Sequence, residues 1–218
     1  TNAEVPGFVP SESSLSQVIE DIVRRANGRV VAACFASHIH RVQQIASAGI
    51  ADGRKIAFFG RSMHRVSDVA RRFGALDIPE EVIMDIEELL LLPEDQQLLI
   101  TTGSQGEPFA AMSLMASGRH RFVTLTPDDT ILISATPIPG NERAVSRVIS
   151  QLHRAGCRVY HGRNSHVHVS GHGAQDELKT FLNVIRPQAF VPIHGEYRHL
   201  RSHADLAREM RIPQVEIC

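Results

Sequence analysis

The sequence lacks an excess of charge of either sign and a long apolar run. Its 218 residues carry 23 Lys and Arg against 24 Asp and Glu, so the formal net charge is −1. Proteins that coat nucleic acid with a broad basic surface are usually strongly cationic, so this balance excludes that class and leaves local phosphate pockets open. The longest apolar run, residues 30–36, and the four leucines at 89–92 are far shorter than the roughly 18 residues of a membrane span.

Cysteine motifs and targeting signals are also absent. The three cysteines, Cys34, Cys157 and Cys218, are odd in number and have no Cys-x-x-Cys spacing, which fits reduced thiols. No basic segment followed by an apolar one opens the chain, so we expect no secretion and a cytoplasmic location. Because there is no repeat, low-complexity segment or linker, the polar residues 162–165 are the best candidate for a domain boundary.

Short apolar runs alternate with segments whose apolar residues recur every three or four positions. The runs predict strands at residues 29–35, 55–59, 97–102, 130–135, 157–160, 189–193 and 215–218. The periodic segments predict helices at residues 15–27, 40–48, 62–73, 85–92, 109–116, 141–155, 177–185 and 197–210. The alternation predicts an α/β fold with a mostly parallel sheet and helices on both faces. Ligands of such sheets gather at the carboxyl ends of the strands.

Two loops at predicted strand ends could bind an anion. Ser37 can cap the helix that follows it and leave neighbouring amides facing an anion; the alternative is a plain helix cap beside an exposed histidine. In residues 101–108, two glycines and Ser104 allow tight curvature that turns backbone amides toward a phosphate. This second loop lacks the Gly-Lys-Ser/Thr element of a P-loop, and an ordinary turn is the alternative.

Seven of the twelve histidines lie between residues 161 and 203, and three of them are close together. In an extended segment His166, His168 and Ser170 would project from one face, and Gly171 would let the chain turn His172 toward the same pocket. Imidazole suits proton transfer near neutral pH and metal binding. A single histidine here would be read as structural, but this spacing predicts a functional cluster.

Three further histidines follow. His194 ends the strand predicted at residues 189–193 and could ligate a metal, with Glu196 nearby as an orienting group. The alternative is a satisfied polar residue at a strand end. His199 and His203 lie four residues apart on the last predicted helix and, without a third partner, are interpreted as solvated surface.

The chain carries five short motifs whose order is informative. They are Thr-Asn-Ala-Glu at 1–4 with Pro-Gly-Phe at 6–8 and Ser-Glu at 11–12, Phe-Ala-Ser at 35–37, Thr-Gly-Ser-Gln-Gly-Glu-Pro at 102–108, His-Val-Ser-Gly-His at 168–172 and Pro-Ile-His-Gly-Glu-Tyr-Arg at 192–198. With these motifs the whole chain resembles the ribonuclease J family, of the β-CASP group within the metallo-β-lactamase superfamily. The resemblance implies the end of a first metallo-β-lactamase segment (1–12), a β-CASP domain (13–165) and the closing βαβ part of the metallo-β-lactamase fold (166–218).

The resemblance also implies roles at matching positions. Those of the substrate-phosphate pocket are His168, Val169, Ser170, Gly171 and His172. Within it Ser170 would bind phosphate and His172 would act as the general acid.

It further implies that Ser37, His38 and Ile39 bind nucleotide, chiefly through Ser37 and backbone groups. Ser104 and its loop would line the RNA path near a 5′ phosphate, and His194 would be one ligand of a zinc pair. The family uses two zinc ions to activate a water that attacks an RNA phosphodiester.

The family's upstream His-x-His-x-Asp-His motif and its C-terminal domain do not occur in the sequence. We therefore expect a fragment of a zinc-dependent ribonuclease, with 5′-to-3′ exonuclease and endonuclease activity in RNA maturation and decay. The fragment is expected to be inactive by itself, because one ligand cannot hold zinc. The implied partners are RNA, especially 5′-monophosphorylated ends, the N-terminal half of the same protein, and further copies in a homodimer or homotetramer, with no membrane.

Two alternatives from other classes remain. The first is a non-catalytic RNA- or nucleotide-binding α/β module, and the second is a phosphate-binding domain of small-molecule metabolism. Restoration of cleavage by the N-terminal half would distinguish the enzyme fragment from the first, and a preference for RNA 5′ ends over free nucleotide would exclude the second.

Overall fold

The structure, a computed structural model, describes residues 2–218, so the motif residue Thr1 lies outside the described residues. The chain divides into two compact units. The sheet unit comprises residues 12–168, and the end unit combines the stretch up to residue 11 with residues 169–218. Among the described residues, no helix combines the length and the apolar character needed to cross a membrane.

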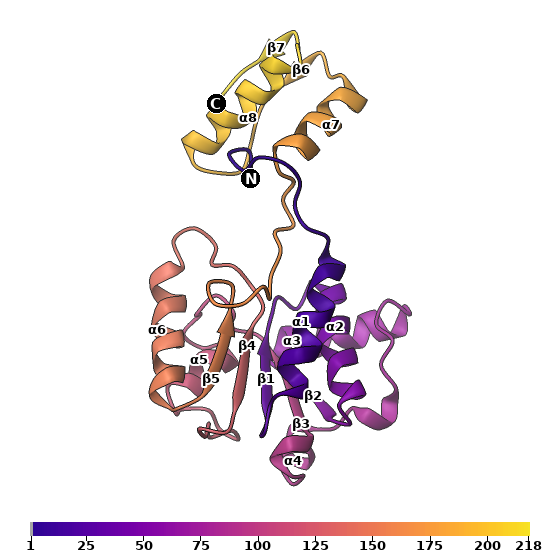
Figure 1. Ribbon diagram of the computed structural model, residues 1–218, viewed down its shortest axis with the longest axis vertical. Helices are drawn as coiled ribbons and strands as arrows, with labels where there is room; N and C mark the ends of the chain where they lie inside the picture. Colours follow the sequence, from indigo (N-terminus) through magenta and orange to yellow (C-terminus); the bar gives the residue numbers. More distant parts are fainter. Residues whose placement is uncertain (1) are drawn as a thin grey trace. The chain divides into compact units, whose positions relative to one another are not determined.

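The sheet unit alternates strands and helices along the chain (Figure 1). Its strands are β1 (Val30–Ala33), β2 (Lys55–Phe59), β3 (Gln97–Thr101), β4 (Thr130–Ile133) and β5 (Arg158–His161). Its helices are α1 (Ser16–Arg24), α2 (Ile39–Ala51), α3 (Arg61–Arg72), α4 (Ile86–Leu89), α5 (Ala111–Ala116) and α6 (Glu142–Arg154), with 3-10 turns η1 (Glu12–Leu15), η2 (Glu80–Val82) and η3 (Glu94–Gln96). The predicted α/β class is confirmed.

The five strands form one parallel sheet in the order β2-β3-β1-β4-β5. Val30 of β1 lies opposite Leu98 of β3 on one side and Thr130 of β4 on the other. The chain leaves β1 toward β2 and leaves β4 toward β5, in opposite directions across the sheet. The crevice between the carboxyl ends of β1 and β4 is therefore the topological switch point, where ligands of open α/β sheets bind.

Helices cover both faces of this sheet (Figure 1). On one face Leu98 lies so close to α2 that a Cβ on Gly49 would come within 2.3 Å of its Cδ2. On the other face Val31 belongs to a core cluster with Met112 of α5 and Leu152 of α6. Because both faces are buried, the strands are apolar at successive positions rather than alternating.

Two buried arginines fill the amino-terminal edge of the sheet. Arg29 donates two hydrogen bonds to Asp129, at 3.0 and 2.8 Å, and both side chains are buried. Arg54 donates to the carbonyl oxygens of Gly28 and Gln97, at 2.8 and 3.2 Å. These contacts pair both buried guanidinium groups within the protein.

The end unit is a small helical unit with a two-stranded parallel sheet. Its elements are α7 (Gln175–Ile185), β6 (Ala189–Phe190), α8 (Tyr197–Glu209) and β7 (Gln214–Val215). Leu182 of α7, Ala207 of α8 and Ile212 form its small core.

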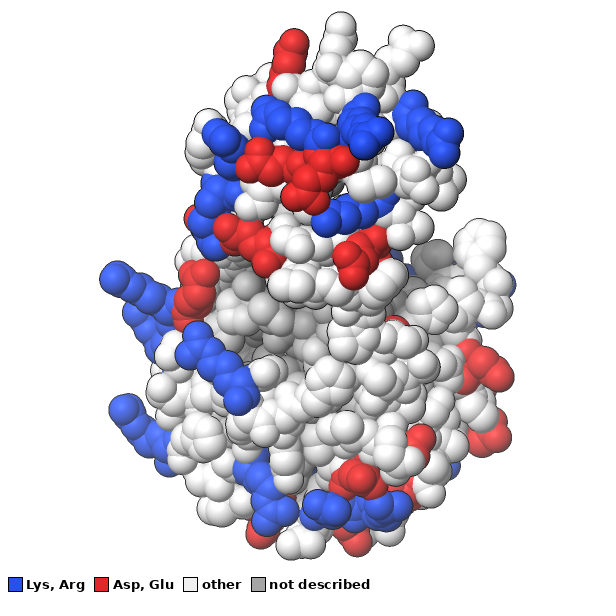
Figure 2. Space-filling model, turned by 45° about the horizontal axis from the view of Figure 1, so that its top comes forward, with Lys and Arg blue, Asp and Glu red and all other residues white. Residues whose placement is uncertain are grey.

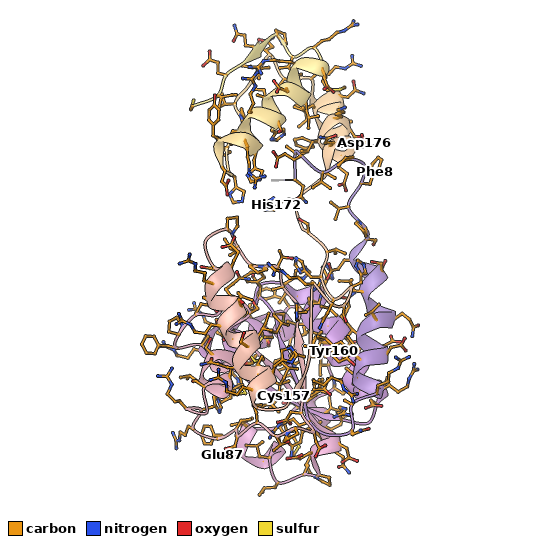
Figure 3. The ribbon with its side chains drawn as sticks, turned by 60° about the vertical axis from the view of Figure 1, so that its left-hand side comes forward. Phe8, Glu87, Cys157, Tyr160, His172 and Asp176 are labelled. Carbon is orange, nitrogen blue, oxygen red and sulfur yellow. The ribbon has the colours of Figure 1, made fainter. Side chains whose placement is uncertain are left out.

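Residues near the amino terminus are bound to the start of α7. The backbone amide of Gln175 donates to the carbonyl oxygen of Val5 at 2.9 Å, and that of Asp176 donates to Gly7 at 3.1 Å. Phe8 and Asp176 are labelled at this junction in Figure 3. Two segments far apart in the sequence therefore make one unit.

Several predicted elements are shorter in the structure. The helix predicted at residues 85–92 is α4 (Ile86–Leu89), and of the strand predicted at residues 215–218 only Val215 belongs to β7. The strand predicted at residues 189–193 ends at Phe190, and Val191 and Ile193 are exposed. The prediction was wrong because apolar composition does not supply a pairing partner, and β6 pairs with β7 over two residues only. The helix predicted at residues 109–116 begins at Ala111, which leaves Phe109 outside it and 88% exposed.

Candidate functional site

Three loops meet at the carboxyl edge of the sheet unit, after β1, β3 and β4. Gln105, in the loop after β3, holds the loop after β4: its Nε2 donates to the Thr136 carbonyl oxygen at 3.0 Å, and its Oε1 accepts from the Ile138 amide at 2.7 Å. On the face drawn in Figure 2, acidic and basic residues are interspersed without a continuous basic surface. Ligand recognition by local pockets, as the charge balance predicts, fits this surface.

The loop after β1 contains the predicted nucleotide-binding residues Ser37, His38 and Ile39. The prediction that Ser37 caps the following helix is wrong: Ser37 is exposed, and Nδ1 of His38 accepts the Arg41 amide at 3.2 Å. Serine and histidine side chains can each accept a hydrogen bond from a backbone amide at a helix start. For Ser37 to be the cap, α2 would have to begin at His38, but it begins at Ile39, so His38 is the cap. Ile39 is the first residue of α2 and is half-buried.

Ser104 lies in the tightly curved loop after β3 and is buried. Gly103 has φ 103°, and a Cβ there would come within 2.9 Å of the Ala110 Cβ. Gly106 has φ 72°, and its Cβ would lie 2.6 Å from the carbonyl carbon of Ala144. Glycine is therefore required at both positions for conformation and for space, as the loop composition predicts.

Cys34 directly follows β1 but is not a candidate nucleophile. Its side chain is buried, and burial raises the pKa of the thiol to about 12, so the thiolate is scarce near neutral pH.

The switch point is filled by a fully buried arginine that the sequence analysis did not single out. Arg41 of α2 directs Nε and Nη2 to Oε1 of Glu12, at 2.7 and 2.6 Å. Its Nη1 donates to the Val167 carbonyl oxygen at 3.0 Å and to the hydroxyl of Ser134. Glu12 and His168 are the first and last residues of the sheet unit. Arg41 therefore contacts the chain both where it enters the sheet unit and where it leaves it.

His168 is the one predicted pocket histidine that contacts this arginine. Its Nδ1 lies 3.5 Å from Nη1 of Arg41, and because a guanidinium can only donate, Nδ1 must accept and the ring proton must be on Nε2. Burial, followed by the positive charge of Arg41, lowers the pKa of His168 to about 4 against the opposing effect of Glu12. Near neutral pH this ring is uncharged and can offer a ligand one Nε2–H donor.

The end unit contains the rest of the predicted phosphate pocket. Asn2 donates from Nδ2 to Oγ of Ser170 at 2.8 Å and to the carbonyl oxygen of His172 at 2.7 Å. The His172 amide also donates to Ser170 Oγ, at 3.1 Å. Since this oxygen accepts twice, the Ser170 hydroxyl proton can be donated to a ligand. Val169 is buried before this turn, and Gly171 is exposed with open space around its Cα.

The rings of His172 and His194 stack in the same unit, with centroids 5.0 Å apart and planes 30° apart. Partial burial and the nearby His194 lower the pKa of His172. His194 has φ 69°, a left-handed conformation that a residue with a Cβ adopts at a cost, and such strain concentrates at functional sites. In Figure 3, His172 is labelled in the irregular segment before α7.

The interpretation of His199 and His203 as solvated surface is wrong. His199 accepts the Glu196 amide on Nδ1 at 3.1 Å at the start of α8. His203 packs edge-on against Phe190 at 4.8 Å, and burial lowers its pKa. The spacing placed both on one face correctly, but that face packs within the end unit.

The histidine pair does not make a complete zinc centre. Within residues 2–218, no group of three or more His, Cys, Asp or Glu side chains is arranged to hold a metal. A catalytic zinc takes about three protein ligands, so His194 and its neighbour His172 could supply only part of one donor set.

Asn2 and Arg41 are the functional candidates that the sequence analysis missed. Arg41 does have a signal, because it shares a helix face with Ile45 and Ala48, which are buried, and a charge on an apolar face needs a buried partner. Asn2 has none, since its contacts are with Ser170 and the backbone about 170 residues away.

Comparison with known proteins assigns both parts of the chain. Residues 27–152 match the family described as ribonuclease J, beta-CASP domain, and residues 158–215 match the family described as Zn-dependent metallo-hydrolase RNA specificity domain. Over 217 residues the chain is 46% identical to ribonuclease J of Mycolicibacterium smegmatis, 42% to that of Synechocystis and 40% to that of Helicobacter pylori. The whole chain is covered, but it spans only 39%, 34% and 31% of these relatives.

Proposed function

The chain belongs to the ribonuclease J family, and on that premise we propose that it is part of a zinc-dependent ribonuclease with 5′-to-3′ exonuclease and endonuclease activity in RNA maturation and decay. The observation that carries the proposal is the turn in which Asn2 holds Ser170 beside the stacked rings of His172 and His194. It combines a phosphate-binding hydroxyl, a proton-transfer group and a potential metal ligand. The free cysteines fit the reducing cytoplasm in which we place the protein.

In this proposal Ser170 donates its hydroxyl proton to a non-bridging oxygen of the scissile phosphate. His172, adjacent in the same turn, protonates the oxygen that leaves when the phosphorus–oxygen bond breaks, as a general acid. His194 contributes one zinc ligand, and the remaining ligands come from parts of the protein outside this chain.

The sheet unit contributes nucleotide contacts at its switch point. Ser37 is exposed in the loop after β1, and the backbone at His38 and Ile39 forms the start of α2. The loop of Ser104 follows β3. His168 offers an uncharged Nε2–H donor. Recognition by hydroxyls, amides and a neutral imidazole suits a 5′-monophosphorylated RNA end held in a pocket rather than on a basic surface.

We expect neither stoichiometric zinc nor RNA cleavage with this chain alone, and restoration of both when a separately produced N-terminal metal-binding half is added. The reason is the incomplete donor set among the described residues. Bound zinc and cleavage of a 5′-monophosphorylated RNA are the measurements. RNA binding without restored cleavage would favour the alternative, a non-catalytic RNA-binding module, whereas stoichiometric zinc with turnover by the chain alone would overturn the fragment interpretation.

The exposed apolar face of α7 is the surface we assign to that half. Phe181, Val184 and Ile185 are 63%, 77% and 53% exposed, a concentration of apolar surface that is unusual on so small a unit. Val184→Asp should weaken assembly of the two parts about tenfold or more, because it places a charge in an apolar contact. Affinity is measured by titrating one part into the other. Asn183→Asp, which adds the same charge at an exposed position on the other side of the helix, is the control; equal affinities for both variants would contradict this assignment.

A further inference from the structure

A large cleft opens beside α3, at the carboxyl ends of β2 and β3. None of the site residues named individually above lines it, although Thr102, at the start of the loop of Ser104, does. Its volume is about 1120 Å³. Phe59 and Thr102 line it from the sheet, α3 lines it along one side, and residues 109–111 with Leu114 also border it. A cavity of this size exceeds what one mononucleotide fills, so an extended ligand fits it better.

Positive charge faces the cleft. Arg61, Arg65 and Arg71 line it, and in the described part of the chain none of the three has an ion-pair partner. Two carboxylates also line the cleft, those of Asp68 and Asp85. Asp68 pairs with Arg72 at 2.9 Å, so only Asp85 offsets one of the three arginine charges. In a chain of net charge −1, three unpaired guanidinium groups along one helix favour a ligand with repeated negative charge.

The start of α3 adds a backbone site for one such charge. Gly60 is the N-cap, and no side chain caps the helix, so its first amides are open to a ligand. Gly60 has φ 105°, and a Cβ there would lie 2.7 Å from the Thr102 Oγ1. About two turns further along α3, Ser67 is buried, lines the cleft and has no hydrogen-bond partner among the described residues.

An aromatic side chain borders the same cleft. Phe109, which precedes α5, is 88% exposed, and Phe59 contributes a half-buried ring from the end of β2. Basic side chains that follow a phosphate backbone, combined with rings on which bases stack, are the combination that binds single-stranded nucleic acid without sequence preference.

We propose that this cleft is a second RNA site, which binds the backbone and one base of single-stranded RNA apart from the pocket residues that hold the reacting end. The inference rests on the proposed ribonuclease function and extends it to the body of the substrate. A phosphate occupies the start of α3, Arg61 and Arg65 neutralise its neighbours, and Phe109 stacks on a base.

Binding of two probes to the 218-residue chain tests the site: a fluorescein-labelled oligouridylate of about 16 nucleotides, and uridine 5′-monophosphate, which cannot span both sites. The double substitution Arg61→Gln with Arg65→Gln should weaken binding of the long probe about tenfold. It should also make the negative slope of log affinity against log salt shallower by about 1.4. Affinity for the mononucleotide should not change. Arg25→Gln with Arg158→Gln is the control, since it removes the same charge from exposed positions before β1 and at the start of β5.

Equal loss in the cleft and control variants, or no loss in either, overturns the second site while leaving the ribonuclease proposal intact. Failure of the unaltered chain to bind either probe overturns the proposed function itself. Two substitutions of Phe109 distinguish base stacking from apolar contact. Phe109→Tyr should retain affinity for the long probe, whereas Phe109→Leu should lower that affinity about fivefold or more. Full affinity in Phe109→Leu would overturn the stacking assignment.

Discussion

Replacing His172 with alanine in the complete protein is expected to lower the rate of RNA cleavage by about 100- to 10,000-fold, the usual contribution of a general acid, with RNA affinity largely retained. The structure gives a reason to expect this separation of rate from binding. The turn is held through the backbone amide and carbonyl of His172, by Ser170 and Asn2, and not through its ring. Removing the ring therefore leaves the phosphate-binding hydroxyl in place.

Single-turnover cleavage of a 5′-monophosphorylated RNA at saturating enzyme measures the rate, and binding of the same RNA measures affinity. His153→Ala is the control, because His153 is exposed on α6 and outside every proposed pocket. A His172→Ala protein that cleaves at the unaltered rate would remove the residue from the chemistry. Equal losses of rate and affinity would instead assign it to substrate binding.

The arrangement of the sheet unit could be predicted from the sequence because its three central strands, β1, β3 and β4, are buried on both faces. Val30–Ala33 and Gln97–Thr101 are buried throughout, so a continuous apolar run identifies them. The same signal was misleading at Val191 and Ile193, which have the composition of a buried strand but lie exposed beyond β6. Periodicity and composition report how apolar a segment is, and they do not report whether a neighbouring strand exists to pair with it.

The site was predictable where it depends on local chemistry and not where it depends on long-range contacts. The loop of Ser104 needs glycine at positions 103 and 106, and both glycines can be read from the sequence. Whether Ser37 or His38 caps α2 depends on a one-residue shift of the helix start, which propensity does not resolve. The contact of Arg41 with Val167 joins positions 126 residues apart, and no local pattern contains it.

Arg41→Met should destabilise the sheet unit by about 2–3 kcal/mol. This is less than the usual cost of breaking a fully buried ion pair, because the side chain of the partner Glu12 is 27% exposed. Arg41 is fully buried, and its loss leaves Glu12 and the Val167 carbonyl oxygen without their guanidinium donor. Denaturant unfolding measures the free energy. Arg24→Met is the control: Arg24 is exposed and pairs with Asp21 one turn away, so its loss should cost about 0–1 kcal/mol. A similar small cost for Arg41→Met would contradict its role.

The same substitution should change how stability depends on pH. Folding lowers the pKa of His168 from 6.5 to about 4, through burial first and the charge of Arg41 second. The unfolded chain therefore binds this proton first, and stability falls as the pH drops from 6.5 toward 4. Without Arg41 the pKa of His168 should rise part of the way toward its ordinary value, because one lowering charge is lost while burial and His38 still lower the pKa and Glu12 still raises it. The decline in stability should then shrink. Titration of the His168 ring by NMR measures this directly; an unchanged pKa would mean that burial alone sets it and that Arg41 holds the chain ends without acting on the pocket histidine.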